Sequence, residues 1–123
     1  MRLALWIGLG SGLGGMLRYL ISGWIASRVG QTFPWGTITV NVIGSFSIGL
    51  LAALSDSQRW IGSPEMRQFL MLGFLGGFTT FSSFSLQTLR LVQDGEWWPA
   101  VGNVVGTTAL CLLFVLIGYK VGQ

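Results

Sequence analysis

Residues that break helices and carry polar groups interrupt an apolar segment near the middle of the chain. From Gly73 to Ser85 the sequence reads GFLGGFTTFSSFS, with three glycines, five hydroxyl side chains and four phenylalanines. A Gly-Gly pair followed by Thr-Thr weakens a helix and can free backbone carbonyl groups. Within lipid, each freed group is costly unless protein, water or an ion satisfies it. The stretch therefore predicts a helix break at membrane depth, which is typical of ion-binding and permeation sites.

The four phenylalanines of this stretch follow a helical spacing. Phe74, Phe78, Phe81 and Phe84 would form one aromatic stripe if the segment were a continuous helix. Such stripes commonly serve packing. A phenyl ring also has a positive edge and a negative face, so ring edges turned inward can contact an anion and ring faces a cation.

Polar residues share one face of the preceding apolar run. Thr37, Asn41 and Ser45 are four residues apart, so a helix places them on the same side. Asn41 is the costly member, because its amide has two donor hydrogens and an acceptor to satisfy. Hydrogen bonding between helices and the lining of a polar path both explain this face.

One basic residue lies deep in the first apolar run. Arg18 is about fifteen residues into that run, where a charge is costly unless it reaches water or a partner. No acidic residue lies within the apolar runs to neutralise it. Arg18 either extends to the nearer membrane interface or lines an aqueous vestibule, where it would raise the local anion concentration.

The composition indicates the class of protein. Of 123 residues, 51% are hydrophobic and 9% are charged, against roughly 25% charged in soluble domains. Because so few charges cannot cover a soluble surface, we expect one integral membrane domain, residues 1–123, in a lipid bilayer. The net charge of +3 is spread over isolated basic residues, so the basic stripe of a nucleic-acid site is missing.

Side chains for enzyme chemistry are scarce. The chain has no histidine, and its four acidic residues lie in loops or at segment ends. Metal sites built from side chains, acid–base pairs and histidine-dependent nucleophiles therefore lack their components, and we expect no enzyme. The single cysteine, Cys111, excludes a disulfide within the chain and is expected to be a small hydrophobic side chain.

Four apolar runs are long enough to cross a bilayer, which takes about 20 helical residues. We predict an all-α fold with spans at residues 3–26, 34–54, 67–92 and 97–121, the third broken near residues 76–80. A secretory signal peptide is the competing interpretation of the first run. That run is too long and too glycine-rich for one, and Arg18 interrupts it. Nearly all six tryptophans fall at span ends, as in an interfacial belt.

Shorter signals mark the connections and the packing faces. Ser63-Pro64-Glu65 predicts a helix start with serine as N-cap, and Asp94-Gly95-Glu96 predicts a tight turn. Small residues at regular spacing let membrane helices approach closely. In the first span these are Gly8, Gly10, Gly12, Gly14 and Gly15.

The basic residues give a weak signal for orientation. One side of the membrane would hold four of them and the other side two, with Arg18 deeper. This difference favours termini in the cytoplasm. A chain with so little bias can insert in both directions.

Three motifs in these spans resemble those of one family. GSGLGGMLRY at residues 10–19 is similar to the family pattern GGxxGAxxRY, with Ser11 and Gly15 as departures. GTITVNVIGSF at residues 36–46 matches closely, and GFLGGFTTFSSF at residues 73–84 has Ser83 where the family usually has threonine. Along nearly its whole length the chain resembles the Fluc/CrcB family of small fluoride ion channels.

This resemblance implies a fluoride-selective channel in the bacterial inner membrane. The chain would cross that membrane several times. Such a channel gives passive efflux of fluoride and protects the cell from fluoride toxicity. The resemblance implies an antiparallel, dual-topology homodimer with two fluoride paths. It also implies a structural Na⁺ at the dimer centre, held by backbone carbonyl groups of Gly76 and Thr79 from both subunits.

The resemblance further assigns residues to the fluoride pathway. Phe81 and Phe84 match the family's pore phenylalanines, Asn41 matches its pore asparagine, and Arg18 its vestibule arginine.

Polar residues of the third and fourth spans extend this assignment. Thr107 falls where a serine is common and keeps the hydroxyl, and together with Ser82 it completes the expected pathway. Asn103 falls where a tyrosine is common, so its role stays open.

Two other functions fit a small four-span chain. A multidrug transporter that exchanges protons needs an acid within the membrane. Asp94 and Glu96 lie in a predicted turn instead. A subunit that assembles without transporting anything is the structural alternative. A fluoride flux assay in liposomes distinguishes all three.

Overall fold

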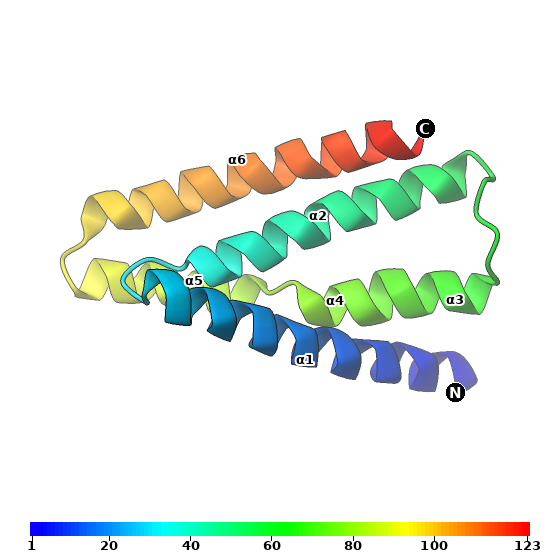
Figure 1. Cartoon of the computed structure of the whole chain (residues 1–123), viewed down its shortest axis with the longest axis horizontal. Coiled ribbons are helices and arrows are strands. Elements are labelled where there is room, and N and C mark those ends of the chain that lie inside the picture. Colours follow the sequence, from blue (N-terminus) through cyan, green and yellow to red (C-terminus); the bar gives the residue numbers. More distant parts are fainter.

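The computed structural model describes all residues from Met1 to Gln123, and its regular elements are all helices (Figure 1). The first two and the last are α1 (Arg2–Val29), α2 (Trp35–Asp56) and α6 (Trp97–Gly122). Between α2 and α6 lies an interrupted span: α3 (Pro64–Gln68), the π-helix η1 (Phe69–Phe74), α4 (Leu75–Phe78) and α5 (Phe81–Gln93). Four helical segments are long and apolar enough to cross a membrane, which confirms the predicted spans and the break in the third.

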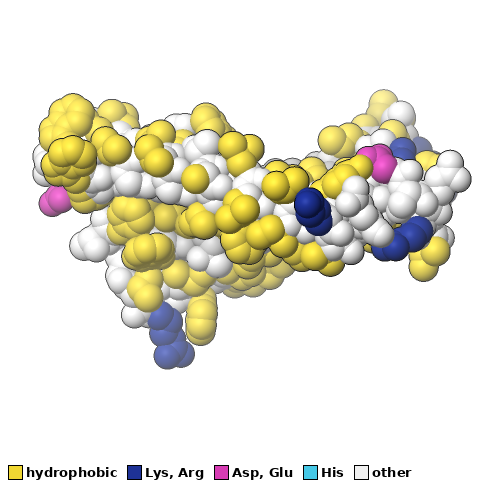
Figure 2. All heavy atoms as spheres, turned by 90° about the horizontal axis from the view of Figure 1, so that it is seen from above, with side chains coloured by type: hydrophobic (Ala, Val, Ile, Leu, Met, Phe, Trp, Pro, Cys, Tyr) yellow, Lys and Arg dark blue, Asp and Glu magenta, His cyan; other side chains and the backbone are white.

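The most extensive packing joins the spans in two pairs. α1 lies along η1 and α4, and α2 lies along α6 (Figure 1). Both chain ends lie at the same end of the bundle. The buried apolar core is small and centres on Val40, Leu75 and Phe78. Many large apolar side chains lie outside instead, and they cover much of the face shown in Figure 2. Such a surface suits contact with lipid.

The two predicted connections are confirmed. Ser63 Oγ accepts a hydrogen bond from the Met66 amide at 3.1 Å, and Pro64 is the first residue of α3. This cap satisfies one of the free amides at the helix start. Between α5 and α6, Gly95 has φ of 78°, a conformation that glycine adopts without strain.

The π-helix was not expected from the sequence. Residues Phe69–Phe74 form a wide turn immediately before α4, where the prediction continued a regular helix. Ser11 Oγ donates a hydrogen bond to the Gly73 carbonyl at 3.3 Å, which joins this turn to α1. Single π-turns inside helices are frequent near functional sites.

Glycines bring α1 close to the third span, but only on one side of α1. A Cβ atom added at Gly10 would lie 2.7 Å from the Phe69 carbonyl oxygen, and one added at Gly14 would overlap the Phe74 carbonyl. The same atom at Gly8 or Gly12 would meet nothing within 4 Å. The predicted close packing therefore holds for Gly10 and Gly14, and not for Gly8 and Gly12.

This difference predicts opposite outcomes for two neighbouring substitutions. Gly14→Val should force α1 away from α4, because the new side chain would overlap backbone that cannot yield. We expect the free energy of unfolding in detergent to fall by about 1–3 kcal/mol, which is the typical cost of overpacking a protein core. Gly12→Val is the matched control and should unfold as the wild type does. Equal unfolding of the two variants would contradict the packing described.

Candidate functional site

The centre of the third span is a two-residue break. α4 ends at Phe78 and α5 begins at Phe81. Thr79 (φ −84°, ψ 157°) and Thr80 (φ −151°, ψ 118°) between them are extended. The last carbonyls of α4 and the first amides of α5 therefore lose their helical partners.

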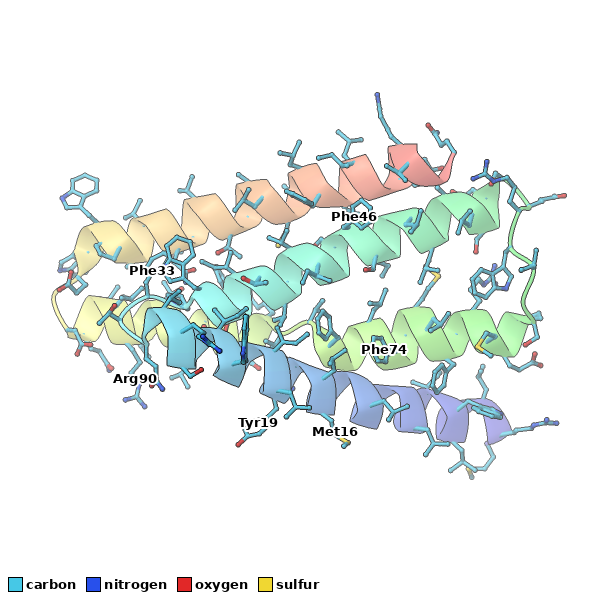
Figure 3. The ribbon with its side chains drawn as sticks, in the orientation of Figure 1. Met16, Tyr19, Phe33, Phe46, Phe74 and Arg90 are labelled. Atoms are coloured by element: carbon cyan, nitrogen blue, oxygen red, sulfur yellow. The ribbon has the colours of Figure 1, made fainter.

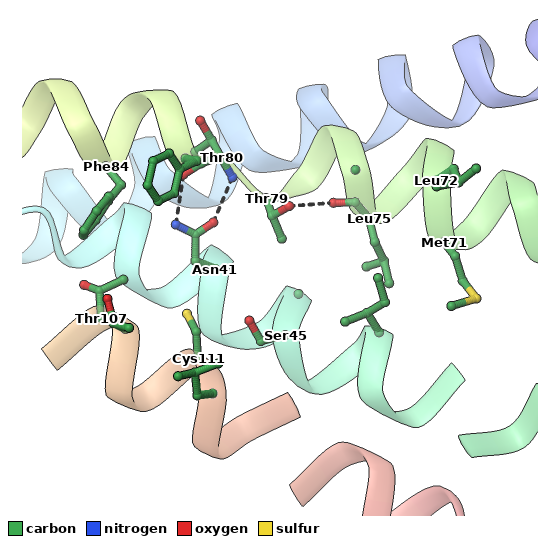
Figure 4. A pocket seen from close by; sticks show the side chains of 16 residues that line it. Asn41, Ser45, Met71, Leu72, Leu75, Thr79, Thr80, Phe84, Thr107 and Cys111 are labelled. Carbon is green, nitrogen blue, oxygen red and sulfur yellow. Dashed lines mark hydrogen bonds between the residues drawn. The ribbon is translucent and has the colours of Figure 1, made fainter. Parts of the chain in front are cut away.

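Asn41 of α2 pairs with the backbone of the break. Its Oδ1 accepts a hydrogen bond from the Thr80 amide at 2.8 Å, and its Nδ2 donates to the Thr80 carbonyl at 3.1 Å (Figure 4). The side chain is only 9% exposed, so few other partners are within reach. Of the two sequence-based interpretations, hydrogen bonding between helices is therefore realised at Asn41.

Thr80 also caps the helix that follows the break. Its Oγ1 accepts from the Ser83 amide at 3.2 Å and donates to Ser83 Oγ at 3.1 Å. A threonine N-cap of this kind stabilises a helix start. Ser82 Oγ lies 3.3 Å from the same oxygen.

Arg18 satisfies a carbonyl on the other side of the break. Its Nε donates to the Gly77 carbonyl oxygen at 3.1 Å. An unbroken helix would give that oxygen the Phe81 amide instead. The partly buried guanidinium thus has a backbone role that neither sequence-based alternative included.

Two further carbonyls at the break lose the amides that would normally reach them. The Thr80 amide would pair with the Gly76 carbonyl in an unbroken helix, but it donates to Asn41. The Ser83 amide would pair with the Thr79 carbonyl, but it donates to Thr80 Oγ1. The Gly76 and Thr79 carbonyls are therefore available to an outside partner.

A cavity of about 550 Å³ lies beside the break, between α2, α6 and the third span (Figure 4). We call it the central cavity. It brings together six of the eight residues that the family resemblance assigned to ion sites. They are Asn41, Gly76, Thr79, Phe81, Phe84 and Thr107.

A second, more polar cavity of about 640 Å³ adjoins the other side of the break. We call it the vestibule. Arg18 lines it together with Arg90 and Asp94. Figure 3 places Arg90 and Phe33, another lining residue, at the same end of the bundle. Ser82, the remaining predicted residue, lines neither cavity.

The polar face of α2 and the break border both of these spaces. Thr37 lines the vestibule, whereas Asn41 and Ser45 line the central cavity. Thr80 lines both. The predicted three-residue face of α2 therefore runs from one cavity to the other, past the break.

The break divides the predicted aromatic stripe into two pairs. The rings of Phe74 and Phe78 stack with centroids 6.1 Å apart, and those of Phe81 and Phe84 lie 5.4 Å apart at 42°. Phe78 is buried in the core, while Phe81 is 79% exposed. Only the second pair lines the central cavity, so a single continuous stripe does not exist.

Asn103 of α6, whose role the sequence left open, bonds to Thr88 and Thr107. The part played by Thr88 was not predicted from the sequence. Asn103 is 1% exposed, and its Nδ2 donates to Thr88 Oγ1 at 2.9 Å. Its Oδ1 accepts from Thr107 Oγ1 at 3.0 Å. Both hydroxyls were visible in the sequence, but their pairing depends on how α5 and α6 are rotated.

Comparison with known proteins identifies the family of this chain. The family described as "CrcB-like protein, Camphor Resistance (CrcB)" matches residues 5–119. The chain belongs to the CrcB family. This confirms the resemblance recognised in the sequence motifs.

Several known proteins resemble the chain over nearly its full length. A protein of Opitutus terrae is 53% identical over 120 residues, covering 97% of this chain and 91% of its own. One of Paramagnetospirillum magneticum is 54% identical over 114 residues, covering 92% and 89%. One of Methylocella silvestris is 48% identical over 118 residues, covering 95% and 90%. Each of these relatives is named a fluoride-specific ion channel, FluC.

The Asn41 contacts predict how the break responds to substitution. Asn41→Leu removes the partners of the Thr80 amide and carbonyl and should lower the free energy of unfolding by about 1–3 kcal/mol for each unpaired group. It should also speed amide hydrogen exchange at residues 79–83, measured by mass spectrometry. Ser45→Ala, one turn along the same face, is the control and should leave exchange there unchanged. Slow exchange retained in Asn41→Leu would show that Asn41 does not hold the break.

Proposed function

We propose that this chain is a fluoride channel of the bacterial inner membrane and that it acts by passive efflux, not as an enzyme. The observation that carries the proposal is the meeting of the vestibule and the central cavity at Thr80, within a membrane-spanning bundle. We take fluoride as the ion because the relatives are named fluoride-specific ion channels. Efflux of this kind protects a cell from fluoride toxicity.

The chemistry of the path suits a small, strongly hydrated anion. A selective path must replace the water around fluoride with other donors. In the vestibule, Arg18 and Arg90 supply positive charge. At the break, the amides at the start of α5 that Thr80 does not cap and the positive end of that helix favour an arriving anion. In the central cavity, the edges of Phe81 and Phe84 add positive partial charge.

A second copy of the chain completes this proposal. Phe81 lines the central cavity yet is 79% exposed, so one copy leaves the path open on this side. Four spans also cannot easily enclose a pore alone. We propose a homodimer of two antiparallel copies with a path in each, which the weak charge bias of the sequence permits. Ser82, beside Thr80 at the start of α5, belongs to this path in the proposal.

The break also suits a resident cation at the dimer centre. The Gly76 and Thr79 carbonyls are freed by the break and belong to residues that line one cavity. Hard cations prefer oxygen ligands of this type. We propose that these carbonyls from both copies hold a structural Na⁺. Bound there, the ion would supply the partner that the carbonyls lack and join the two copies.

Fluoride release from liposomes tests the proposed function. Purified protein, reconstituted into liposomes loaded with fluoride, should release it down its gradient faster than chloride, without a pH gradient. A fluoride electrode measures the rate. No release above that of protein-free liposomes would reject the channel. Release that requires a proton gradient, or export of organic cations, would favour a transporter.

The second phenylalanine pair gives a sharper prediction within the same assay. Phe81→Ile and Phe84→Ile keep most of the bulk but lose the ring edges, so fluoride flux should fall. A contact of about 0.5–1.5 kcal/mol corresponds to a roughly two- to tenfold fall. Phe74→Ile is the control, because Phe74 lines neither cavity. Unchanged flux in Phe81→Ile and Phe84→Ile would assign these rings to packing alone.

Removal of sodium tests the cation. The proposed ligands are main-chain oxygens, so the ion must be replaced instead of the residues. Exchange of Na⁺ for N-methylglucamine should reduce flux and weaken the dimer in gel filtration, and added Na⁺ should restore both. The flux of a sodium-independent channel in matched liposomes is the control. A dimer and flux indifferent to Na⁺ would overturn this part of the proposal.

A further inference from the structure

The Asn103 carboxamide joins two hydroxyl groups that can each donate or accept. Asn103 Nδ2 donates to Thr88 Oγ1 at 2.9 Å, and Thr88 Oγ1 donates in turn to the Phe84 carbonyl at 2.8 Å. At the other end, Thr107 Oγ1 donates to Asn103 Oδ1 at 3.0 Å. With 1% of Asn103 exposed, its carboxamide has little access to other partners.

The direction of these bonds decides what Thr107 offers to the central cavity. A hydroxyl has one proton, and here the proton of Thr107 is directed at Asn103. Thr107 therefore presents only lone pairs to the cavity that it lines. Lone pairs repel an anion, so in this arrangement Thr107 cannot serve fluoride as a donor.

A half-turn of the carboxamide reverses the direction without moving any backbone. Asn103 Nδ2 would then donate to Thr107 Oγ1, and Thr88 Oγ1 would donate to Asn103 Oδ1. The only bond lost is that from Thr88 to the Phe84 carbonyl. An α-helix already pairs that carbonyl with the Thr88 amide. The proton of Thr107 is now free to point into the cavity.

We propose that Asn103 is a positioning residue that switches Thr107 between acceptor and donor toward the central cavity. The donor state receives a fluoride ion, and the acceptor state releases it. This inference rests on the proposed fluoride channel and deepens it, because it names a residue outside the cavity that controls the anion's partner within it.

Asn103→Asp tests the switch through its pH dependence. A carboxylate only accepts hydrogen bonds, so it holds the protons of both Thr88 and Thr107 and should suppress fluoride flux at about pH 8. When the pH is lowered to about 5, a buried carboxylate takes up a proton and can donate to Thr107. Flux should then recover several-fold, while wild-type flux changes little. Release from protein-free liposomes is subtracted at each pH.

Two double variants separate the switch from simple charge repulsion. Loss of a negative charge would raise flux at low pH whatever residue stood at position 107. Release of the Thr107 proton needs a hydroxyl there. Asn103→Asp with Thr107→Ser should keep the pH-dependent recovery, and Asn103→Asp with Thr107→Val should lose it. Recovery in both, or in neither, would overturn the proposal.

Thr88→Val provides a test that does not depend on a buried charge. Valine leaves the carboxamide without an acceptor on the α5 side, and an unpaired N–H is worse tolerated than an unpaired carbonyl. The amide nitrogen should turn toward Thr107, so flux should rise in Thr88→Val and fall in Thr107→Val. If both variants lower flux alike, the three residues are merely structural.

Wild-type flux distinguishes failure of the channel from failure of the switch. If the wild type releases no fluoride, the proposed function itself fails. If the wild type conducts and Asn103→Asp is indifferent to pH, only the switch fails.

Discussion

Backbone polar groups that a helix break exposes within the membrane must find partners, and the arrangement of this chain follows from that requirement. Lipid offers neither donors nor acceptors, so the groups must be paired by protein, water or an ion. Thr79 and Thr80 interrupt the third span at its centre. Two other spans contribute a polar side chain that pairs with the interruption.

These pairings join elements far apart in the sequence. Asn41 of α2 binds both backbone groups of Thr80, and Arg18 of α1 binds the Gly77 carbonyl. Residues that look costly in an apolar helix therefore stabilise the break. The same pairing leaves the Gly76 and Thr79 carbonyls without helical partners, beside a cavity that shares the lining residue Thr80 with the vestibule. Structure and proposed ion binding thus arise from one feature.

Much of the fold could be predicted because it depends on local pattern. Apolar runs of sufficient length predicted four spans, Gly-Gly-Thr-Thr predicted the break, and Ser63-Pro64-Glu65 predicted a helix start. The shared face of Thr37, Asn41 and Ser45 followed from helical spacing alone. Six of the eight residues assigned to ion sites line one cavity, although their roles stay predictions.

What could not be predicted depends on how helices are rotated against one another. The bond from Arg18 to Gly77 and the bridge from Thr88 through Asn103 to Thr107 join distant residues. The π-helix is itself local, but Ser11 of the distant α1 bonds to its Gly73 carbonyl. Glycine spacing likewise did not separate Gly10 and Gly14, which meet the third span, from Gly8 and Gly12, which meet nothing. Spacing shows which residues share a face, but it does not show what that face contacts.

The most direct test of this account is a high-resolution structure of the protein in a lipid nanodisc containing Na⁺. We expect two inverted copies whose breaks meet, with a density peak ligated by the Gly76 and Thr79 carbonyls of both. A single copy whose break faces acyl chains, or carbonyls paired within the same chain and no ion between them, would contradict the account.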